Sequence, residues 1–314
     1  MVAGRLGSVL ILAIPLVACR PAPFIFDTTN QMPSDKSSAS SAKTEICGDG
    51  RMTAFNRLRY MARNFIRNLD FSRCAVKADK FCMRRQARTS GLVSPSRSLT
   101  EAFLCRKLPL LLPPGKRRIL DIGCGAGGLV RLLAVLGYTG SYVGIDIQDG
   151  FDRSELPGFD KKFEVIDAHC YRAEEKFDLV ISVSALEHIP DDERLIESLG
   201  KMVAPGGLQL HFVPGGWALP VYLWHGYRQY TVTSLVQRFG ADQTAIYAMG
   251  GAPSFFLHLL FITGWEILLR LSFRKRFPGT YTRLLDRCLA LDPYLPVLGT
   301  FHAVVWQPAP SLHP

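Results

Sequence analysis

The sequence predicts an α/β protein with a parallel, doubly wound sheet. From about residue 116 onward, short apolar segments typical of buried strands alternate with segments of helical periodicity, the clearest being 126–136 and 191–203. A glycine-rich run at 121–127 joins the first strand to the first of these helices. Alternating strands and helices favour a parallel sheet covered by helices on both faces. Strands are expected at 118–122, 142–147, 163–166, 177–182, 208–213, 243–248 and 301–307.

The first 50 residues differ from the rest of the chain. An apolar run at 6–18 precedes Cys19, and residues 16–19 resemble a bacterial lipoprotein cleavage box. This run is shorter than the ~20 apolar residues that a membrane-spanning helix needs. Residues 28–45 are rich in Ser, Thr, Asn and Lys, which is typical of a disordered linker. We therefore expect an apolar segment and a disordered linker over 1–50.

Residues 51–115 are expected to form basic helices. Residues 51–90 carry 11 Lys or Arg against 2 Asp or Glu, within a chain of formal net charge +10. Such a block indicates either a surface for an anionic partner or a solvated basic helix without one. An amphipathic helix is expected at 52–70, and a second helix from Ser98 to about Leu112, before a Pro-Pro-Gly stop.

None of the eight cysteines has CxxC spacing, so we expect reduced thiols and a cytoplasmic protein.

Residues 251–300, between the last two strands, form an expected apolar helical insertion. The segment 255–273 is long enough to raise the question of a membrane span, but Glu266 and Arg270 lie inside it. Each charge costs about 2.5–3.5 kcal/mol at a bilayer centre, so spanning is not favoured. We expect a helix lying on the inner face of an anionic membrane. The alternative is that its apolar face packs on the sheet or on a partner subunit. Residues 301–314 supply the last strand and the tail.

The run Asp-Ile-Gly-Cys-Gly-Ala-Gly at 121–127 predicts a nucleotide-like ligand at the end of the first strand. Glycines there allow a tight turn and close approach of the backbone, and the following helix offers free N–H groups. Asp146 ends the second strand, where a carboxylate accepts ribose hydroxyls, and Asp167 follows the third, where one accepts an adenine amino group. Asp121 would repel a pyrophosphate but attract a sulfonium with an ammonium group. The negative charge of Asp121 therefore favours S-adenosylmethionine (SAM) over a nicotinamide dinucleotide as the ligand.

Residues 116–213 resemble the class I SAM-dependent methyltransferases, near the group that includes the ubiquinone-biosynthesis methyltransferases. The resemblance rests on Leu-Asp-Ile-Gly-Cys-Gly-Ala-Gly at 120–127, Gly-Ile-Asp at 144–146, Ile-Asp-Ala at 166–168, the segment 177–191 and the turn Pro-Gly-Gly at 205–207. It implies a Rossmann-like, seven-stranded sheet with a terminal antiparallel hairpin, within a SAM-binding core at 116–250. The implied cofactor-binding residues are Asp121, Gly123, Cys124, Gly125, Gly127, Asp146, Ile147, Asp167, Ala168 and Ser184.

Catalysis of methyl transfer rests mainly on holding the acceptor in line with the sulfonium and on excluding water. His188 follows the fourth strand and His225 follows the fifth, and either is a candidate general base for a hydroxyl acceptor. In the ubiquinone O-methyltransferase relatives the segment Glu-x-Leu-Glu-His can hold a metal. Ser184 replaces the first Glu here, so no metal is expected. The aromatic loop after the fifth strand predicts an acceptor pocket formed by Trp217, Tyr222, Tyr227, Arg228 and Tyr230.

The sequence thus predicts a SAM-dependent methyltransferase that acts, at oxygen, on a small-molecule, glycan or lipid-linked acceptor. A non-catalytic SAM-binding or scaffold protein and an RNA methyltransferase are the alternatives. Nucleic acid is not the expected partner, because no Asn/Asp-Pro-Pro-aromatic tetrad follows the fourth strand. An exported lipoprotein would leave the compartment where SAM is made. We therefore expect a cytoplasmic location, peripheral to the inner membrane face, and Met32 and Met52 as alternative start residues.

Overall fold

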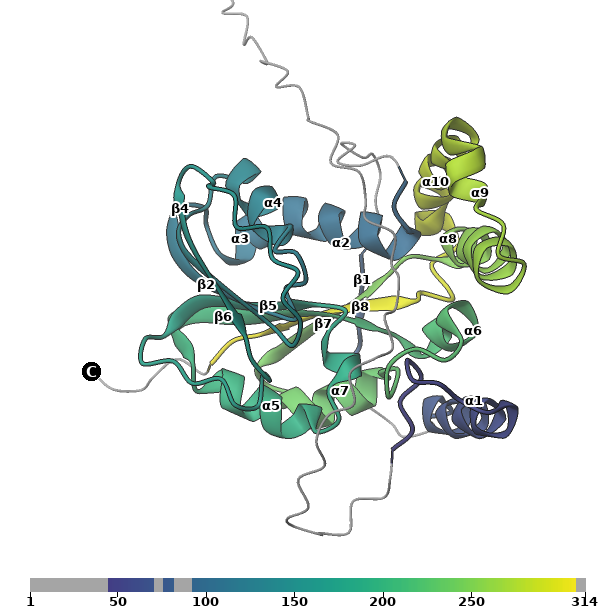
Figure 1. The fold of residues 1–314 in the computed structure, drawn as a ribbon, viewed down its shortest axis with the longest axis horizontal. Helices are drawn as coiled ribbons and strands as arrows, with labels where there is room; N and C mark the ends of the chain where they lie inside the picture. The colour runs from purple at the N-terminus through teal and green to yellow at the C-terminus, as the bar shows by residue number, and fades with distance from the viewer. Residues whose placement is uncertain (1–44, 71–75, 82–91, 309–314) are drawn as a thin grey trace, which may run out of the picture. The chain divides into compact units, whose positions relative to one another are not determined.

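The protein is built around an eight-stranded sheet (Figure 1). The computed structural model describes residues 45–70, 76–81 and 92–308. The predicted apolar segment and linker lie almost wholly outside them. The strands are β1 (Asp79–Phe81), β2 (Lys116–Ile122), β3 (Thr139–Asp146), β4 (Phe159–Val165), β5 (Phe177–Val183), β6 (Val203–Pro214), β7 (Thr244–Met249) and β8 (Phe301–Trp306).

The strand order is β1-β7-β8-β6-β5-β2-β3-β4. The five strands from β2 to β6 pair in parallel, whereas β8 is antiparallel to both β6 and β7. The order reverses between β2 and β5, which pair directly although two strands separate them in the chain. This is the switch point where ligands bind in open α/β sheets. All seven predicted strands, the doubly wound fold and the terminal antiparallel pair are confirmed.

The predicted count of seven strands was wrong by one. β1 adds an eighth strand, parallel to β7, with Asp79 opposite Tyr247 and Phe81 opposite Met249. The segment Asp-Lys-Phe is too short to show a strand pattern, and its pairing partner lies more than 160 residues away. Its one inward side chain, Phe81, is buried and packs edge-on against Phe103.

Helices cover both faces of the sheet (Figure 1). One face carries α2, α3 and α4, whose buried side chains include Leu99, Phe103, Leu108 and Leu133. The other face carries α5 and α7, which bury Leu195, Leu199, Leu235 and Phe239. Burial on both faces explains why the central strands read as continuous apolar runs. The bounds are α1 (Ala54–Asn68), α2 (Pro95–Arg106), α3 (Leu108–Leu111), α4 (Leu129–Val135), η1 (Leu186–His188), α5 (Asp192–Gly200), η2 (Gly216–Ala218), α6 (Leu219–Tyr222) and α7 (Val232–Phe239).

The predicted helical insertion is present and packs against the α2 face of the sheet. It comprises α8 (Ala252–Leu257), η3 (His258–Leu268), α9 (Phe273–Arg276), α10 (Pro278–Leu291) and η4 (Asp292–Tyr294). Its inner residues Ile262, Tyr281 and Leu285 join the same core as α2. Among the described helices, none combines the length and the apolar character that crossing a membrane requires.

The expected helix at 255–273 ends earlier than predicted. Arg270 has a φ of 56°, a left-handed conformation that ends the helix, so the residues beyond it no longer continue the same helix. Glu266 pairs with Arg274, and its Oε2 lies 2.6 Å from Nη2 of Arg274. The outer side of η3 leaves Leu260, Trp265 and Leu268 exposed.

The amphipathic helix predicted at 52–70 is present as α1, but its apolar side faces outward. Phe55, Leu58, Phe65 and Ile66 are all more than half exposed. An apolar groove of about 510 Å³ runs between α1 and the η2–α6 segment, and Trp217 forms part of its wall. Of the residues described, therefore, none covers most of this helix face.

Candidate functional site

The glycine-rich loop joins β2 to α4 at the carboxyl end of the sheet. Gly123 and Gly127 have φ of 66° and 76°. A Cβ on Gly123 would lie 2.6 Å from Cβ of Ala185, and one on Gly127 would lie 2.6 Å from the Phe163 ring. Only glycine permits this conformation at such close range. At Gly125, by contrast, a Cβ would meet nothing within 4 Å, so the loop opens there onto free space.

Two of the predicted carboxylates flank this loop. Oδ2 of Asp146 accepts a hydrogen bond from the Gly125 amide at 2.8 Å, while Oδ1 accepts one from the Gln148 amide at 3.1 Å. Asp167, at the end of the next strand, accepts from the His169 amide at 2.8 Å. Both aspartates thus stand at the carboxyl ends of neighbouring strands. Ile147 is exposed beside Asp146, and it offers an apolar surface at the rim of the site.

Asp121 lies beneath the loop and is almost fully buried. Burial raises its pKa to about 7, although a hydrogen bond from the Tyr142 hydroxyl and the charge of Arg97 act to lower it. A carboxyl group with this pKa changes charge near neutral pH, and a nearby cation would favour its ionised form.

A pocket opens between the start of α2 and the ends of β5 and β6. This α2 pocket has a volume of about 240 Å³ and is lined by Ser94, Ser96, Arg97, Ser184, Glu187, Tyr222 and His225, among others. Ser184 adopts a φ of 53°, which is uncommon for a residue other than glycine. Strained conformations of this kind concentrate at functional sites. The hydroxyl groups of Ser96 and Tyr222 lie 2.5 Å apart across the pocket wall.

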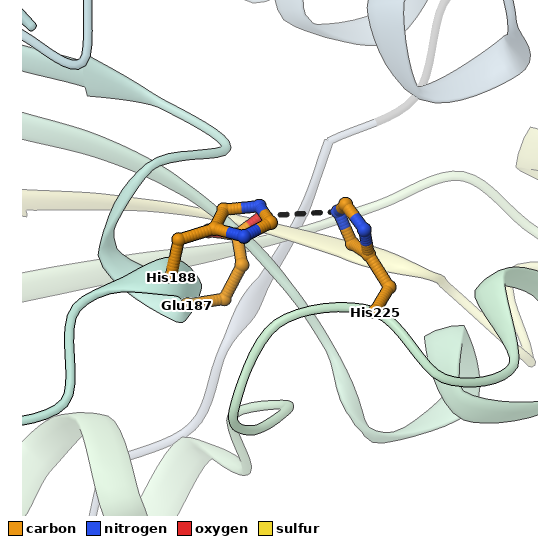
Figure 2. Close-up of side chains that lie close together, drawn as sticks. All are labelled: Glu187, His188 and His225. Atoms are coloured by element: carbon orange, nitrogen blue, oxygen red, sulfur yellow. Dashed lines mark ion pairs between the residues drawn. The ribbon is translucent and has the colours of Figure 1, made fainter. Parts of the chain in front are cut away.

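Four residues from three separate segments form what we call the histidine cluster: Asp49, Glu187, His188 and His225. Glu187 and His188 belong to η1, and His225 follows α6 (Figure 2). The two imidazole rings are edge-to-face with centroids 4.5 Å apart. Asp49 bridges them, with Oδ2 2.7 Å from Nδ1 of His188 and Oδ1 3.2 Å from Nδ1 of His225. Asp49 also accepts from the Gly226 amide at 3.2 Å.

The electrostatics of the cluster follow from these contacts. Burial raises the pKa of Glu187, although both histidines act to lower it. Burial disfavours the charged form of His188, but the hydrogen bond to Asp49 and the nearby Glu187 outweigh it and raise the pKa. Burial likewise acts to raise the pKa of Asp49, yet its two histidine partners hold it well below the usual range.

The predicted substrate-binding residues lie in different parts of the structure. Tyr222 lines the α2 pocket, as does the predicted base His225. Trp217 instead lines the groove beside α1. Tyr227 lies outside the residues that line the α2 pocket, and its amide donates to the Glu187 carbonyl at 2.7 Å.

Arg228 and Tyr230 lie in a buried ion-pair network. The Arg228 side chain is 4% exposed and lies 2.5 Å from Asp192, while it also pairs with Glu45. The Tyr230 hydroxyl donates to Asp192 at 2.7 Å. The structure therefore places the guanidinium beside carboxylates of the protein itself, and the prediction that Arg228 belongs to the acceptor pocket gains no support from its position.

Several residues at the site were not singled out from the sequence. Ser94 and Pro95 begin α2 three residues before the predicted start, and a Ser-Pro pair is a known helix-start signal that would have found them. Arg97 then falls on the pocket wall. Asp49 lies in a segment with no recognisable pattern, so nothing in the sequence connects it with His188 or His225.

Comparison with known proteins identifies relatives of this region. Residues 97–243 match the family model described as a methyltransferase domain. The ubiquinone biosynthesis O-methyltransferase of Hydrogenovibrio crunogenus is 36% identical over 98 residues, which are 29% of this chain and 40% of that protein. The trans-aconitate 2-methyltransferase of Variovorax paradoxus is 34% identical over 109 residues, 33% of this chain and 40% of that protein. The chain therefore spans about 40% of the length of the curated relatives it matches.

Two solved structures illustrate the structural neighbours. A putative sarcosine dimethylglycine methyltransferase from Galdieria sulphuraria superimposes with a TM-score of 0.43 and 14% identity, covering 66% of this chain and 84% of that one. Phosphoethanolamine N-methyltransferase 2 of Haemonchus contortus, in complex with SAM, superimposes with a TM-score of 0.42 and 18% identity, covering 64% of this chain and 51% of that one.

Proposed function

The chain contains a class I, SAM-dependent methyltransferase domain, and we propose that it transfers the methyl group of SAM to a hydroxyl of a small-molecule, glycan or lipid-linked acceptor. SAM is the cofactor of this domain. The whole reaction needs two ligands, a charged cofactor and an acceptor, held in line with each other. The residues around the glycine-rich loop and the α2 pocket provide one place for each.

The cofactor is proposed to lie across the carboxyl ends of β2, β3 and β4. Asp121, Gly123, Cys124 and Gly125 would surround its methionine part, with Gly127 keeping the loop close to the sheet. Asp146 would accept the ribose hydroxyls, releasing the Gly125 amide that it now holds. Ile147, Asp167 and Ala168 would contact the adenine. Ser184, which lines the α2 pocket, would lie near the reactive methyl group.

The acceptor is proposed to enter the α2 pocket. Its volume of about 240 Å³ suits a group of roughly the size of one ring, so a longer acceptor would extend outside it. Hydroxyl groups of Ser94, Ser96 and Tyr222 and the guanidinium of Arg97 offer polar partners for an oxygen-bearing group. The methyl acceptor must lose a proton during transfer to oxygen. His188 and His225 are the proposed residues that assist this loss, with Asp49 holding both rings.

The observation that carries the proposal is the position of the α2 pocket. Its wall includes Ser184, the chain neighbour of the Ala185 that lies against Gly123 of the glycine-rich loop, and it contains a histidine that a buried glutamate and an aspartate flank. A segment with only a structural role would not need the strained backbone of Ser184, the α2 pocket and the histidine cluster in one place.

Two measurements test the proposal. Calorimetry should show one SAM per chain, and comparison of metabolites and lipids from cells with and without the gene should show the loss of one methylated compound. Absence of SAM binding contradicts the proposal entirely. Binding without any lost methyl group would favour the non-catalytic alternative, and loss of a methylated nucleoside would favour an RNA acceptor.

Contact with an anionic membrane is a second proposal, supported by two exposed apolar surfaces. The outward side of α1 and the outward side of η3 both adjoin α6. Arg57 and Arg59 lie on α1, and Lys275 and Arg276 lie on α9, which packs against η3. Such flanking cations attract anionic lipid. A lipid-linked acceptor would then reach the enzyme from the bilayer surface.

A further inference from the structure

The groove beside α1, here called the α1 groove, is an apolar site that the proposed reaction does not yet use. Its volume of about 510 Å³, against about 240 Å³ for the α2 pocket, is within the range of small-molecule sites, about 300–1,000 Å³. No charged side chain of the described residues lines it, and Asn68 donates to the Gly216 carbonyl at 3.3 Å. The residues that line it include Leu58, Phe65, Leu69, Trp217, Leu219 and Pro220.

The walls of the α1 groove are open to solvent in the part of the chain that the structure describes. Leu58 is 70% exposed, Phe65 is 58% exposed and Trp217 is 55% exposed. Exposed apolar side chains that adjoin one another in this way mark a binding surface. Because the walls offer apolar contacts and few hydrogen bonds, the ligand that suits them is a hydrocarbon chain.

The α1 groove and the α2 pocket share two structural elements, the helices α1 and α6, which contact each other (Figure 1). Pro220 of α6 lines the groove, whereas Tyr222 of the same helix lines the pocket. On α1, Met61 lines the groove, and its neighbour Tyr60 donates to the carbonyl of the pocket residue His225 at 2.7 Å. The two sites are therefore neighbours, separated by the single turn of α6.

One extended molecule can occupy both sites. Successive residues of a helix are turned by about 100°, so Pro220 and Tyr222 point to different sides of α6. A helix with its side chains is about 10–12 Å across, so a chain that leaves the α2 pocket reaches the α1 groove after roughly 10 Å. The α2 pocket itself holds a group of roughly one ring. A ligand that fills both sites therefore has a small polar head and a long apolar tail.

We propose that the α1 groove binds the hydrocarbon chain of the acceptor while the hydroxyl-bearing head occupies the α2 pocket. The substrate class is then a single-chain amphiphile. This assignment rests on the proposed function, and it narrows the acceptor to the lipid-linked class. Helix α1 lies outside residues 97–243, which match the family model, so this wall of the groove is not part of the matched methyltransferase domain.

The proposal is tested with alkyl glucosides, whose head is one hydroxylated ring and whose chain length is the only variable. Methyl, hexyl, octyl, decyl and dodecyl β-glucoside are titrated by calorimetry into the full-length protein with SAM present, each below its micelle-forming concentration. Chains up to hexyl only pass α6 and should add little. From octyl to dodecyl the affinity should rise about tenfold or more, because each methylene buried in the groove strengthens binding about three- to fourfold. An equal gain at every length would place the tail in the groove without the head in the pocket and would overturn the proposal.

Variants of α1 locate the chain. Leu58→Ser and Phe65→Ser should each lower the affinity for dodecyl glucoside about fivefold or more, because each removes apolar contact area. Phe55→Ser and Ile66→Ser are the matched controls, since both side chains are exposed on the same helix but do not line the groove. The controls should bind dodecyl glucoside like the wild type. Unchanged SAM affinity shows that each variant is folded. Equal glucoside affinity in the wild type, Leu58→Ser and Phe65→Ser overturns the proposal.

Other occupants of the groove give different results. Glucoside binding that appears only after removal of residues 1–43 would show that the N-terminal segment fills the groove, and a dimer that Phe65→Ser dissociates would show that a second copy fills it. Either result overturns the proposal, as does the absence of dodecyl glucoside binding. In cells, the methylated compound that disappears with the gene should be recovered in the organic phase of a lipid extract, and its recovery in the aqueous phase contradicts the proposal. SAM binding without dependence on chain length rejects the groove assignment alone. Chain binding that Phe65→Ser weakens, in a protein that does not bind SAM, rejects only the methyltransferase proposal.

Discussion

The hydroxyl of Tyr142 on β3 donates a 2.5 Å hydrogen bond to Oδ2 of Asp121 on the adjacent strand β2. Because burial still raises the pKa of Asp121 to about 7, this carboxyl is partly protonated at neutral pH. The ammonium group of SAM would interact with the ionised form. SAM affinity should therefore rise about fivefold from pH 6 to pH 7, a range in which an α-ammonium stays largely protonated. Calorimetry at both pH values measures this. Asp121→Asn should bind SAM weakly and with little pH dependence, and an equally steep response in that variant would place the titrating group elsewhere.

The ribose contact is tested by Asp146→Ala. The substitution removes charge-assisted hydrogen bonds worth roughly 1.5–3 kcal/mol, so SAM affinity should fall at least tenfold. Asp160→Ala is the matched control, because Asp160 lies on β4 and is exposed at the opposite end of the strands. The control should bind SAM like the wild type. Unchanged affinity in Asp146→Ala rules out the ribose assignment.

A chain that starts at Met52 should bind SAM as well as one that starts at Lys43, because the proposed cofactor residues all lie beyond residue 120. It should nevertheless be less stable. Glu45 pairs with the buried Arg228, and Asp49 with both histidines of the cluster. Loss of hydrogen bonds to charged groups costs about 1.5–3 kcal/mol each. Thermal unfolding of the two chains measures the difference, and Glu45→Gln in the longer chain should reproduce part of it. Identical melting temperatures would show that these contacts do not contribute to stability.

Three buried histidines should make the stability of the protein sensitive to mild acidification. Burial lowers the pKa of His211 to about 3, of His258 to about 3 and of His302 to about 4. At these three sites the unfolded chain, with histidine pKa values near 6.5, binds more protons than the folded one below that pH, so their contribution to the free energy of unfolding falls as the pH drops. The raised pKa values of Asp121 and Asp292 act in the opposite direction and offset part of the loss. Each histidine should cost about 2 kcal/mol at pH 5 relative to pH 7. Denaturant titrations at both pH values measure the loss. His211→Gln should reduce the pH dependence, whereas His169→Gln should leave it unchanged.

Membrane contact is tested by flotation with vesicles. The full-length protein should float with vesicles containing phosphatidylserine and should bind them less at high salt, because part of the attraction is electrostatic. Replacing the exposed Phe256, Leu260 and Trp265 of the insertion with Ser should weaken binding. Phe255 is not a suitable target, since it is buried and its loss would damage the fold. A protein that stays at the bottom of the gradient under all conditions has no such membrane surface.

Local patterns were sufficient to predict seven of the eight strands and the glycine-rich turn after β2. A strand that is buried on both faces has a short apolar run in the sequence. A tight turn that requires positive φ is occupied by glycine, so the residue type itself indicates the turn. Both signals lie within a few residues of the feature they describe. Asp121, Asp146 and Asp167 were singled out in the same way, because each lies at or just beyond the end of a strand.

The histidine cluster could not be predicted because its parts meet only in the folded chain. Asp49 lies 139 residues before His188, and His225 arrives on a separate loop. The surroundings of Arg228 were not predictable either. Its neighbours in the aromatic loop indicated a ligand pocket, whereas Asp192 and Glu45, which neutralise it, come from distant segments.

The two outer strands of the sheet have a consequence for behaviour at high concentration. An open strand edge offers unpaired N–H and C=O groups to a neighbouring molecule, and such edges are where aggregation by sheet extension begins. Here β1 is only three residues long, and two of them are Asp79 and Lys80. At the other edge, β4 carries Asp160, Lys161, Lys162 and Glu164 within seven residues. A second molecule approaching either edge would have to bury these charges, so the protein should stay dispersed where a longer, apolar edge would draw copies together.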